Sequence, residues 1–281
     1  MSTGSVKKPK VIIHCLSAPI KLSRMSKFYA NYHSHRAAFR HLFDDVCSTP
    51  ILLLQGASGS GKTSLITHCM GDIPFDVIRL CVQLRADSVG MEEIFSRSID
   101  EVGTGNLRLY QQCLEEQLSQ SVQLTNVAQH GTTNTINVDL SMSESAAKSR
   151  RTARLTQAWF DDMRIYNSPI VVILDAYEQA PSEVQDWISG PFLARASRCK
   201  NVRVAIAGQR VPVPGIEWGA RASLLEFNGV FEPDEWVPVI RGMKKKVREP
   251  ADVFIAGICQ LLKGHPSDIM NFIEGLNDAP K

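Results

Sequence analysis

Between Pro50 and Asn228 the chain alternates between two kinds of hydrophobic pattern. Short apolar runs are separated by stretches whose apolar residues recur at helical spacing. This alternation is typical of β–α units that build a parallel sheet covered by helices. The predicted strands are Ile51–Gln55, Asp76–Gln83, Ile170–Asp175, Val202–Gly208 and Ala222–Phe227. The predicted helices are Lys62–Met70, Met91–Val102, Leu107–Ser119, Ser149–Tyr166 and Ser182–Ser189.

The two ends of the chain follow other patterns. Val11–Ala18 has the pattern of a short strand, and Ser26–Val46 has a helical spacing of apolar residues. After Asn228 the pattern predicts helices alone, at Pro233–Lys246, Ala251–Lys263 and Ser267–Leu276. We therefore divide the chain into an N-terminal segment (1–45), an α/β core (46–228) and a small helical lid (229–281).

One segment interrupts the β–α alternation. Between residues 122 and 140, apolar residues alternate at Ile136, Val138 and Leu140, and Gly131 marks a turn. This pattern predicts a β-hairpin inserted between two helices, followed by a polar loop over 141–149. No function follows from the hairpin itself.

The composition places the chain among soluble globular proteins. Hydrophobic residues make up 44% and charged residues 21% of its 281 residues. No apolar run approaches the ~20 residues of a membrane helix, and the first residues lack the apolar core of a signal peptide. Seven scattered cysteines without a C-x-x-C pair indicate reduced thiols. We therefore expect a cytoplasmic protein without membrane contact, and the net charge of +2 is too mild to indicate nucleic acid.

The strongest motif lies directly after the first predicted core strand. Residues 56–63, GASGSGKT, fit the phosphate-loop pattern G-x-x-x-x-G-K-[ST] between a strand and a helix. Glycines let backbone N–H groups turn toward a phosphate, and the helix N-terminus adds its positive dipole end. We expect Lys62 to reach the β- and γ-phosphates and Thr63 to ligate Mg²⁺. The predicted nucleotide contacts are Gly56, Ser58, Gly59, Ser60, Gly61, Lys62, Thr63 and Ser64. The alternative is a flexible Gly/Ser turn before a helix.

A carboxylate for the magnesium ion is predicted at the end of a buried strand. Asp175 follows five apolar residues, at the strand end where α/β sheets bind ligands. Glu178, three residues later, is placed to polarise an attacking water as a general base. The alternatives are a structural cap for Asp175 and an ordinary surface glutamate for Glu178. Asp161 and Asp162, on a polar helix face, are lesser competitors.

A further polar tip follows the strand Val202–Gly208. Gln209 and Arg210 come directly after it, beside the strand that carries Asp175. From there Arg210 is placed to contact the γ-phosphate and to neutralise charge during phosphoryl transfer. A solvated loop arginine explains the same spacing equally well.

In this order, the motifs GASGSGKTS, VVILDAYEQ, VAIAGQR and Gly264-His265-Pro266 resemble the STAND class of P-loop NTPases, signal-transduction ATPases related to AAA+ proteins. The stretch RRTARLTQAWFDDM before the acidic strand resembles bacterial members, and the likeness extends from about His35 to Leu276. In that class a G-x-P proline packs near the nucleotide base, which implies this position for Pro266. His35-Arg36 only weakly matches the G-R-E-like element with which such proteins open. The class usually adds a winged helix and a repeat array, so we expect the sensor and effector in partners or in the first 45 residues.

The resemblance implies a molecular switch that binds ATP with Mg²⁺, hydrolyses it slowly, and controls self-assembly or a signalling partner. Its bacterial relatives tend to serve in defence. The alternative is an AAA+-type ATPase that acts on DNA, for which the basic run at 241–248 is the candidate contact; a solvated helix end explains that run as well. A small-molecule kinase fits less well, because a kinase does not need Glu178 to orient water. Arg150, Arg151 and Arg154 are candidates for an arginine that acts across a subunit boundary. No N-K-x-D stretch for guanine recognition is present.

Overall fold

The computed structural model describes residues 32–44, 47–85, 91–117, 137–166, 168–248 and 250–278. At its centre five parallel strands form one sheet in the order β2-β3-β4-β1-β5. The strands are β1 (Ile51–Gly56), β2 (Ile78–Gln83), β3 (Ile170–Asp175), β4 (Val202–Gly208) and β5 (Ala222–Phe227). Because all of them run the same way, their carboxyl ends meet at one edge, which confirms the predicted α/β fold with a parallel sheet.

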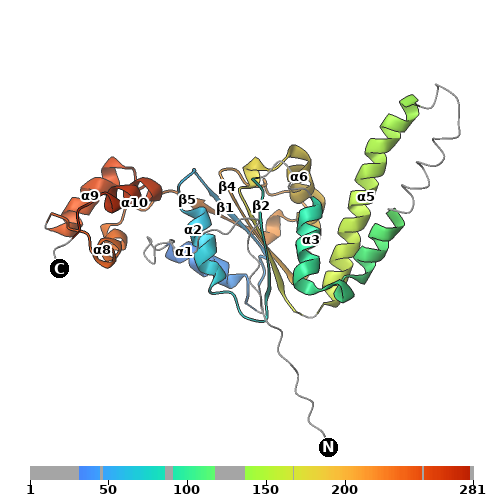
Figure 1. Cartoon of the computed structure of the whole chain (residues 1–281), viewed down its shortest axis with the longest axis horizontal. Coiled ribbons are helices and arrows are strands. Elements are labelled where there is room, and N and C mark those ends of the chain that lie inside the picture. Colours follow the sequence, from blue (N-terminus) through green and yellow to red (C-terminus); the bar gives the residue numbers. More distant parts are fainter. Residues whose placement is uncertain are drawn as a thin grey trace, which may run out of the picture.

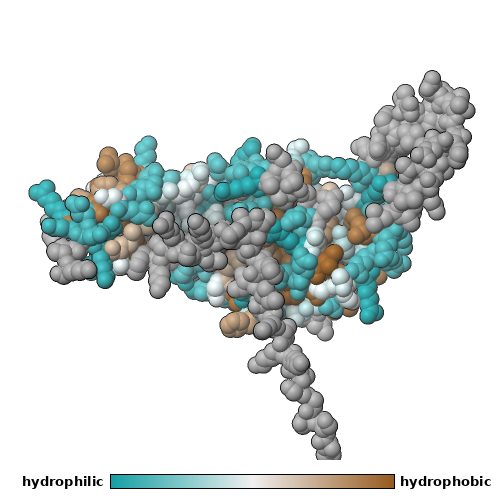
Figure 2. Space-filling model, viewed as in Figure 1, coloured by the Kyte–Doolittle hydropathy of each residue, from teal (hydrophilic) through white to brown (hydrophobic). Residues whose placement is uncertain are grey.

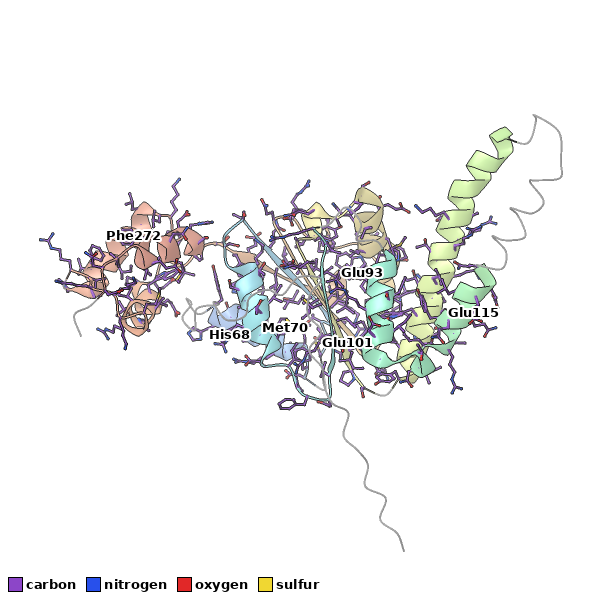
Figure 3. All side chains as sticks on the ribbon, viewed as in Figure 1. His68, Met70, Glu93, Glu101, Glu115 and Phe272 are labelled. Atoms are coloured by element: carbon purple, nitrogen blue, oxygen red, sulfur yellow. The ribbon has the colours of Figure 1, made fainter. Side chains whose placement is uncertain are left out.

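Helices cover both faces of this sheet (Figure 1). Helices α1 (His33–His41) and α2 (Lys62–Met70) share a hydrophobic cluster with alternate strand residues such as Leu52 and Leu54. Leu53 and its equivalents point the other way, into a larger cluster with the opposite helices. Those helices are α3 (Met91–Val102), residues 108–117, α5 (Asn137–Ile165), α6 (Ser182–Trp187), η4 (Ile188–Phe192) and α7 (Leu193–Ala196). Figure 3 shows this separation, with His68 and Met70 on α2 and Glu93 and Glu101 on α3.

The predicted hairpin at 122–140 is wrong where the structure describes it. Residues 137–140 belong to helix α5, and the expected loop over 141–149 is helical as well. Residues 122–136, the rest of the predicted hairpin, lie outside the described residues. Three alternating apolar positions were too few to decide, because the spacing of four residues between positions 136 and 140 in the sequence fits a helix as well as a strand. Strong helix formers such as Met142, Glu144 and Ala146 extend the helix.

The segment after β5 folds into the lid. Helices α8 (Pro233–Gly242), α9 (Ala251–Leu261) and α10 (Pro266–Glu274) pack around the fully buried Trp236 in a hydrophobic cluster of their own. Helix α8 ends four residues earlier than predicted, because Lys244 takes a left-handed backbone conformation with φ 56°. The lid forms one end of the molecule, and hydrophobic residues show on its outer surface over α9 (Figures 1 and 2).

The helices of the described segments are not suited to crossing a bilayer, since none of them combines the necessary length with sufficient hydropathy. The predicted strand at Val11–Ala18 lies outside the described residues.

Candidate nucleotide-binding site

The phosphate loop connects β1 to α2 with the backbone that its glycines allow. Gly59 and Gly61 have φ values of 76° and 94°, in the left-handed region that disfavours other residues. At Gly56 there is no room for a side chain, because a Cβ would lie 2.6 Å from Cβ of Phe227. The fold therefore requires glycine at 59 and 61 for their backbone conformation and at 56 for lack of space. The loop leads directly into the N-terminus of α2.

Lys62 lies inside this loop. Its Nζ donates hydrogen bonds to the carbonyl oxygens of Gly56 and Ala57, each at 2.7 Å, and lies 3.2 Å from Oγ of Ser60. Burial lowers the pKa of this ammonium group, while the negative charges of Glu178 and Asp175 partly oppose that shift. A partly desolvated cation held at a ring of backbone groups is well suited to an anionic ligand.

The two predicted magnesium ligands lie side by side. The hydroxyl of Thr63 donates to Oδ2 of Asp175 at 2.8 Å, although 112 residues separate them in the chain. Among the described residues no three His, Cys, Asp or Glu side chains cluster as a metal site. A hydroxyl and one carboxylate nevertheless fit Mg²⁺, which prefers hard oxygen ligands and usually keeps waters and substrate phosphates as its others.

Asp175 is followed by a residue in an unfavourable conformation. Ala176 has φ 60° and ψ 45°, and its N–H donates to Oδ1 of Asp175 at 2.9 Å. A left-handed residue costs about 1–2 kcal/mol unless it is glycine. This left-handed residue turns the chain sharply after β3, so that Asp175 faces Thr63 while Glu178 returns toward the sheet edge.

We expect two substitutions at Ala176 to affect the free energy of unfolding very differently. Ala176→Gly removes the strain but also a buried methyl group and gives the unfolded chain more freedom, so stability should change by less than about 1 kcal/mol. Ala176→Val should destabilise the protein by more than about 2 kcal/mol, because a β-branched residue is strained there and overpacks the site. Urea denaturation followed by circular dichroism measures both. Equal stability of the two variants would contradict the strained turn.

Glu178 is held by the tip of β4. Its Oε2 accepts a hydrogen bond from the backbone N–H of Gln209 at 2.9 Å, and Nε2 of Gln209 lies 3.5 Å from Oε1. Gly208 makes this approach possible, because a Cβ there would clash with the carbonyl oxygen of Arg210 and lie 2.6 Å from Oε2 of Glu178. The structure therefore brings the predicted base and the predicted phosphate-sensing tip together, through Gln209. Arg210 itself is exposed on the tip.

The lesser candidates have structural roles away from the loop. Asp162 accepts the backbone N–H groups of Leu109 and Tyr110 at 3.2 and 2.9 Å, so it caps the helix over 108–117. Asp161 pairs with Arg164 at 2.7 Å, and Arg154 pairs with Glu116 at 3.0 Å.

A group of aromatic residues beside the loop was not predicted from the sequence as part of the site. Tyr32, His35 and Phe227 form a group with ring centroids 4.4–5.0 Å apart. The hydroxyl of Tyr32 donates to the carbonyl oxygen of Ser60 at 2.8 Å, and Nε2 of His35 lies 3.0 Å from the carbonyl oxygen of Glu226. Burial raises the pKa of Tyr32 and lowers that of His35. The weak match at His35-Arg36 was the one sequence signal for this group.

The lid also contacts the phosphate loop. Nε2 of His265 lies 2.7 Å from the carbonyl oxygen of Ser58, and the N–H of Ser267 donates to the carbonyl oxygen of Gly59 at 3.1 Å. Pro266, between them, is buried at the first position of α10. The Gly264-His265-Pro266 segment thus lies against the loop, whereas Ser64 is exposed in the first turn of α2.

The basic run at 241–248 lies on the lid. Lys245 is used structurally, because its Nζ donates to the carbonyl oxygen of Leu276 and to Asp278, both at 3.0 Å. Arg241, Lys244, Lys246 and Arg248 are exposed.

A family comparison agrees with these features. Residues 34–204 match the model of the AAA ATPase domain, which is more than half of the chain. The chain therefore belongs to the AAA ATPase domain family, whose members bind nucleotide. No curated protein matches the sequence.

Several solved structures are similar to this chain. The Walker-type ATPase PABY2304 of Pyrococcus abyssi is 14% identical with a TM-score of 0.48, and the match covers 87% of this chain and 66% of that protein. A chain of the Drosophila ORC bound to DNA is 12% identical with a TM-score of 0.38, over 70% of this chain and 93% of that one. PCH-2 of C. elegans is 14% identical with a TM-score of 0.34, over 85% and 59% of the two chains. The chain thus spans somewhat less than two thirds of PABY2304.

Proposed function

We propose that this AAA ATPase domain is a nucleotide-controlled switch of the STAND type. It binds ATP with Mg²⁺ and hydrolyses it slowly, and its nucleotide state controls self-assembly or a protein partner that carries the sensor or effector. The observation that carries the proposal is the contact of the Gly264-His265-Pro266 segment with Ser58 and Gly59 of the phosphate loop. A lid that rests on the loop itself responds directly to what the loop binds.

The loop residues bind the phosphates in this proposal. Backbone N–H groups over 56–61 surround them, with Ser64 at the first turn of α2, and Lys62 exchanges its carbonyl partners for the β- and γ-phosphate oxygens. Thr63 and Asp175 hold Mg²⁺, which neutralises charge on the phosphates. Pro266 and the aromatic group of Tyr32, His35 and Phe227 flank the base.

In this proposal hydrolysis depends on the residues that follow β3 and β4. Glu178 orients the attacking water as general base, and Arg210 contacts the γ-phosphate. The bond from Gln209 to Oε2 of Glu178 has to be exchanged before this carboxylate serves a water, which is consistent with slow turnover. A β4 tip that binds both Glu178 and the γ-phosphate changes its contacts when the γ-phosphate is lost.

The wider role is inferred by analogy with the class: a cytoplasmic protein in bacterial defence signalling. An AAA+-type ATPase that acts on DNA is the alternative, and the exposed cations Arg241, Lys244, Lys246 and Arg248 of the lid favour it. A kinase has no comparable support.

The nucleotide carried by the purified protein separates the two functions. We expect close to one ADP per chain when the protein is denatured and the released nucleotide is identified by chromatography. A resting switch retains its product, because the lid and Tyr32 both contact the loop. A protein that carries no nucleotide and exchanges ATP freely would contradict the resting switch and favour a turnover machine that needs DNA or a partner.

A further inference from the structure

Three consecutive carbonyl groups of the phosphate loop receive hydrogen bonds from outside the loop. Those of Ser58 and Gly59 are bound by His265 and by the N–H of Ser267, and that of Ser60 is bound by the hydroxyl of Tyr32. The donors come from both ends of the described chain and meet on one short stretch of backbone. We call these three donor groups the clasp.

In the proposed function the clasp acts on peptide units that bind a phosphate. Each carbonyl shares a peptide unit with the N–H of the next residue, so the bonded carbonyls of residues 58, 59 and 60 belong to the N–H groups of residues 59, 60 and 61. The N–H of Ser60 donates to the carbonyl oxygen of Ala57 at 3.2 Å and exchanges this partner for the phosphate. A hydrogen bond to a carbonyl polarises its peptide unit and strengthens that N–H as a donor. A phosphate held by these N–H groups in turn makes the carbonyls better acceptors for the clasp.

Gly59 has a second reason to be glycine. The motif has no fixed residue at this position, but a Cβ there would lie 2.6 Å from Cε1 of His265 and 3.0 Å from Cβ of Ser267. The side chains of the lid therefore leave no room for a side chain at position 59. At Gly61 the ring of Tyr32 would be in ordinary contact with a Cβ, at 3.4 Å.

The His265 ring is oriented from its other side. Its Nδ1 lies 2.8 Å from Oδ2 of Asp268, and the carbonyl oxygen of Ser58 at Nε2 is also an acceptor. Because a carbonyl oxygen can only accept, Nε2 is the ring nitrogen that donates to the loop.

We propose that His265, Ser267 and Tyr32 are positioning residues that couple lid docking to phosphate binding. The inference rests on the proposed function, because it names the contact through which nucleotide state reaches the lid. The coupling is reciprocal: a ligand with phosphates tightens the lid on the loop, and a docked lid tightens binding of the phosphates. Adenosine, which has no phosphate, takes part in this coupling only through Pro266 at its base, so its binding should respond much less than that of ADP.

Isothermal titration of ADP and of adenosine tests the coupling. We expect His265→Ala to weaken ADP binding about 5- to 20-fold, within the usual range of coupling between sites, and to leave adenosine binding within about 2-fold. Tyr32→Phe, which keeps the ring, should weaken ADP binding in the same selective way. His265→Gln, which restores an N–H donor, should recover most of the affinity. Asn271→Ala, on an exposed part of the same helix, is the matched control.

Amide hydrogen exchange of the peptide over 265–270 gives an independent measure. ADP should slow exchange of the Ser267 amide in the wild type, and His265→Ala should reduce that protection. If the wild type binds no ADP, the proposed function fails. If it binds ADP, and His265→Ala and Tyr32→Phe bind it equally well with unchanged protection, the clasp alone is wrong. An equal loss for ADP and adenosine would also overturn it, as a merely structural effect.

Discussion

Lys62→Ala is expected to weaken ATP and ADP binding about 100-fold or more and to reduce hydrolysis by a similar factor. The side chain lies within the loop, and residues 56–63 contain no second cation to replace its charge there. The folded protein should persist, because the carbonyls of Gly56 and Ala57 lose a donor while the cost of burying the ammonium disappears too. Nucleotide titration and stabilisation against heat by ADP measure the effect.

Lys200→Ala is the matched control for this variant. Lys200 is exposed before the start of β4, at the sheet edge opposite the phosphate loop, and its loss removes the same charge. It should bind nucleotide like the wild type. Unchanged affinity in Lys62→Ala would remove the phosphate-loop assignment, and the Gly/Ser turn would then be the better interpretation.

Glu178→Gln is expected to reduce hydrolysis about 100- to 10,000-fold while nucleotide affinity changes less than about 3-fold. An amide oxygen still accepts the hydrogen bond from the backbone of Gln209, so the tip of β4 keeps its position. The amide lacks the basicity that polarises a water. Single-turnover hydrolysis of ATP, measured beside equilibrium binding, separates the two effects.

Glu183→Gln provides the comparison for a surface glutamate. Glu183 is exposed on α6 and pairs with Lys148 at 2.8 Å. Its substitution should leave hydrolysis unchanged. Hydrolysis by Glu178→Gln at the wild-type rate would show that Glu178 is a surface residue of the same kind.

Local sequence patterns predicted much of the fold. The bounds of β3, β4, β5, α2 and α3 agree with the predicted ones, because each is a short apolar run or a helix with clear end signals. The pairing of Thr63 with Asp175 was also predictable, since both follow strands whose carboxyl ends share one edge. The prediction for the inserted segment was wrong because its local pattern was ambiguous. Its few apolar residues fitted both a strand and a helix, and the helix over Asn137–Ile165 has a polar sequence.

The sequence alone determined that residues 56–63 connect a strand to a helix and that Asp175 ends a strand at the same sheet edge, because those properties depend on residues close in the chain and on the parallel direction of the strands. Only the tertiary structure decided which distant residues contact the loop and the tip of β4. Tyr32 is 28 residues from Ser60, His265 is 207 from Ser58, and Gln209 is 31 from Glu178. These contacts are single hydrogen bonds between distant segments, and they leave no periodic trace in the sequence. They form only once hydrophobic burial has packed the lid and the sheet, which is the dominant force in folding but has no direction of its own.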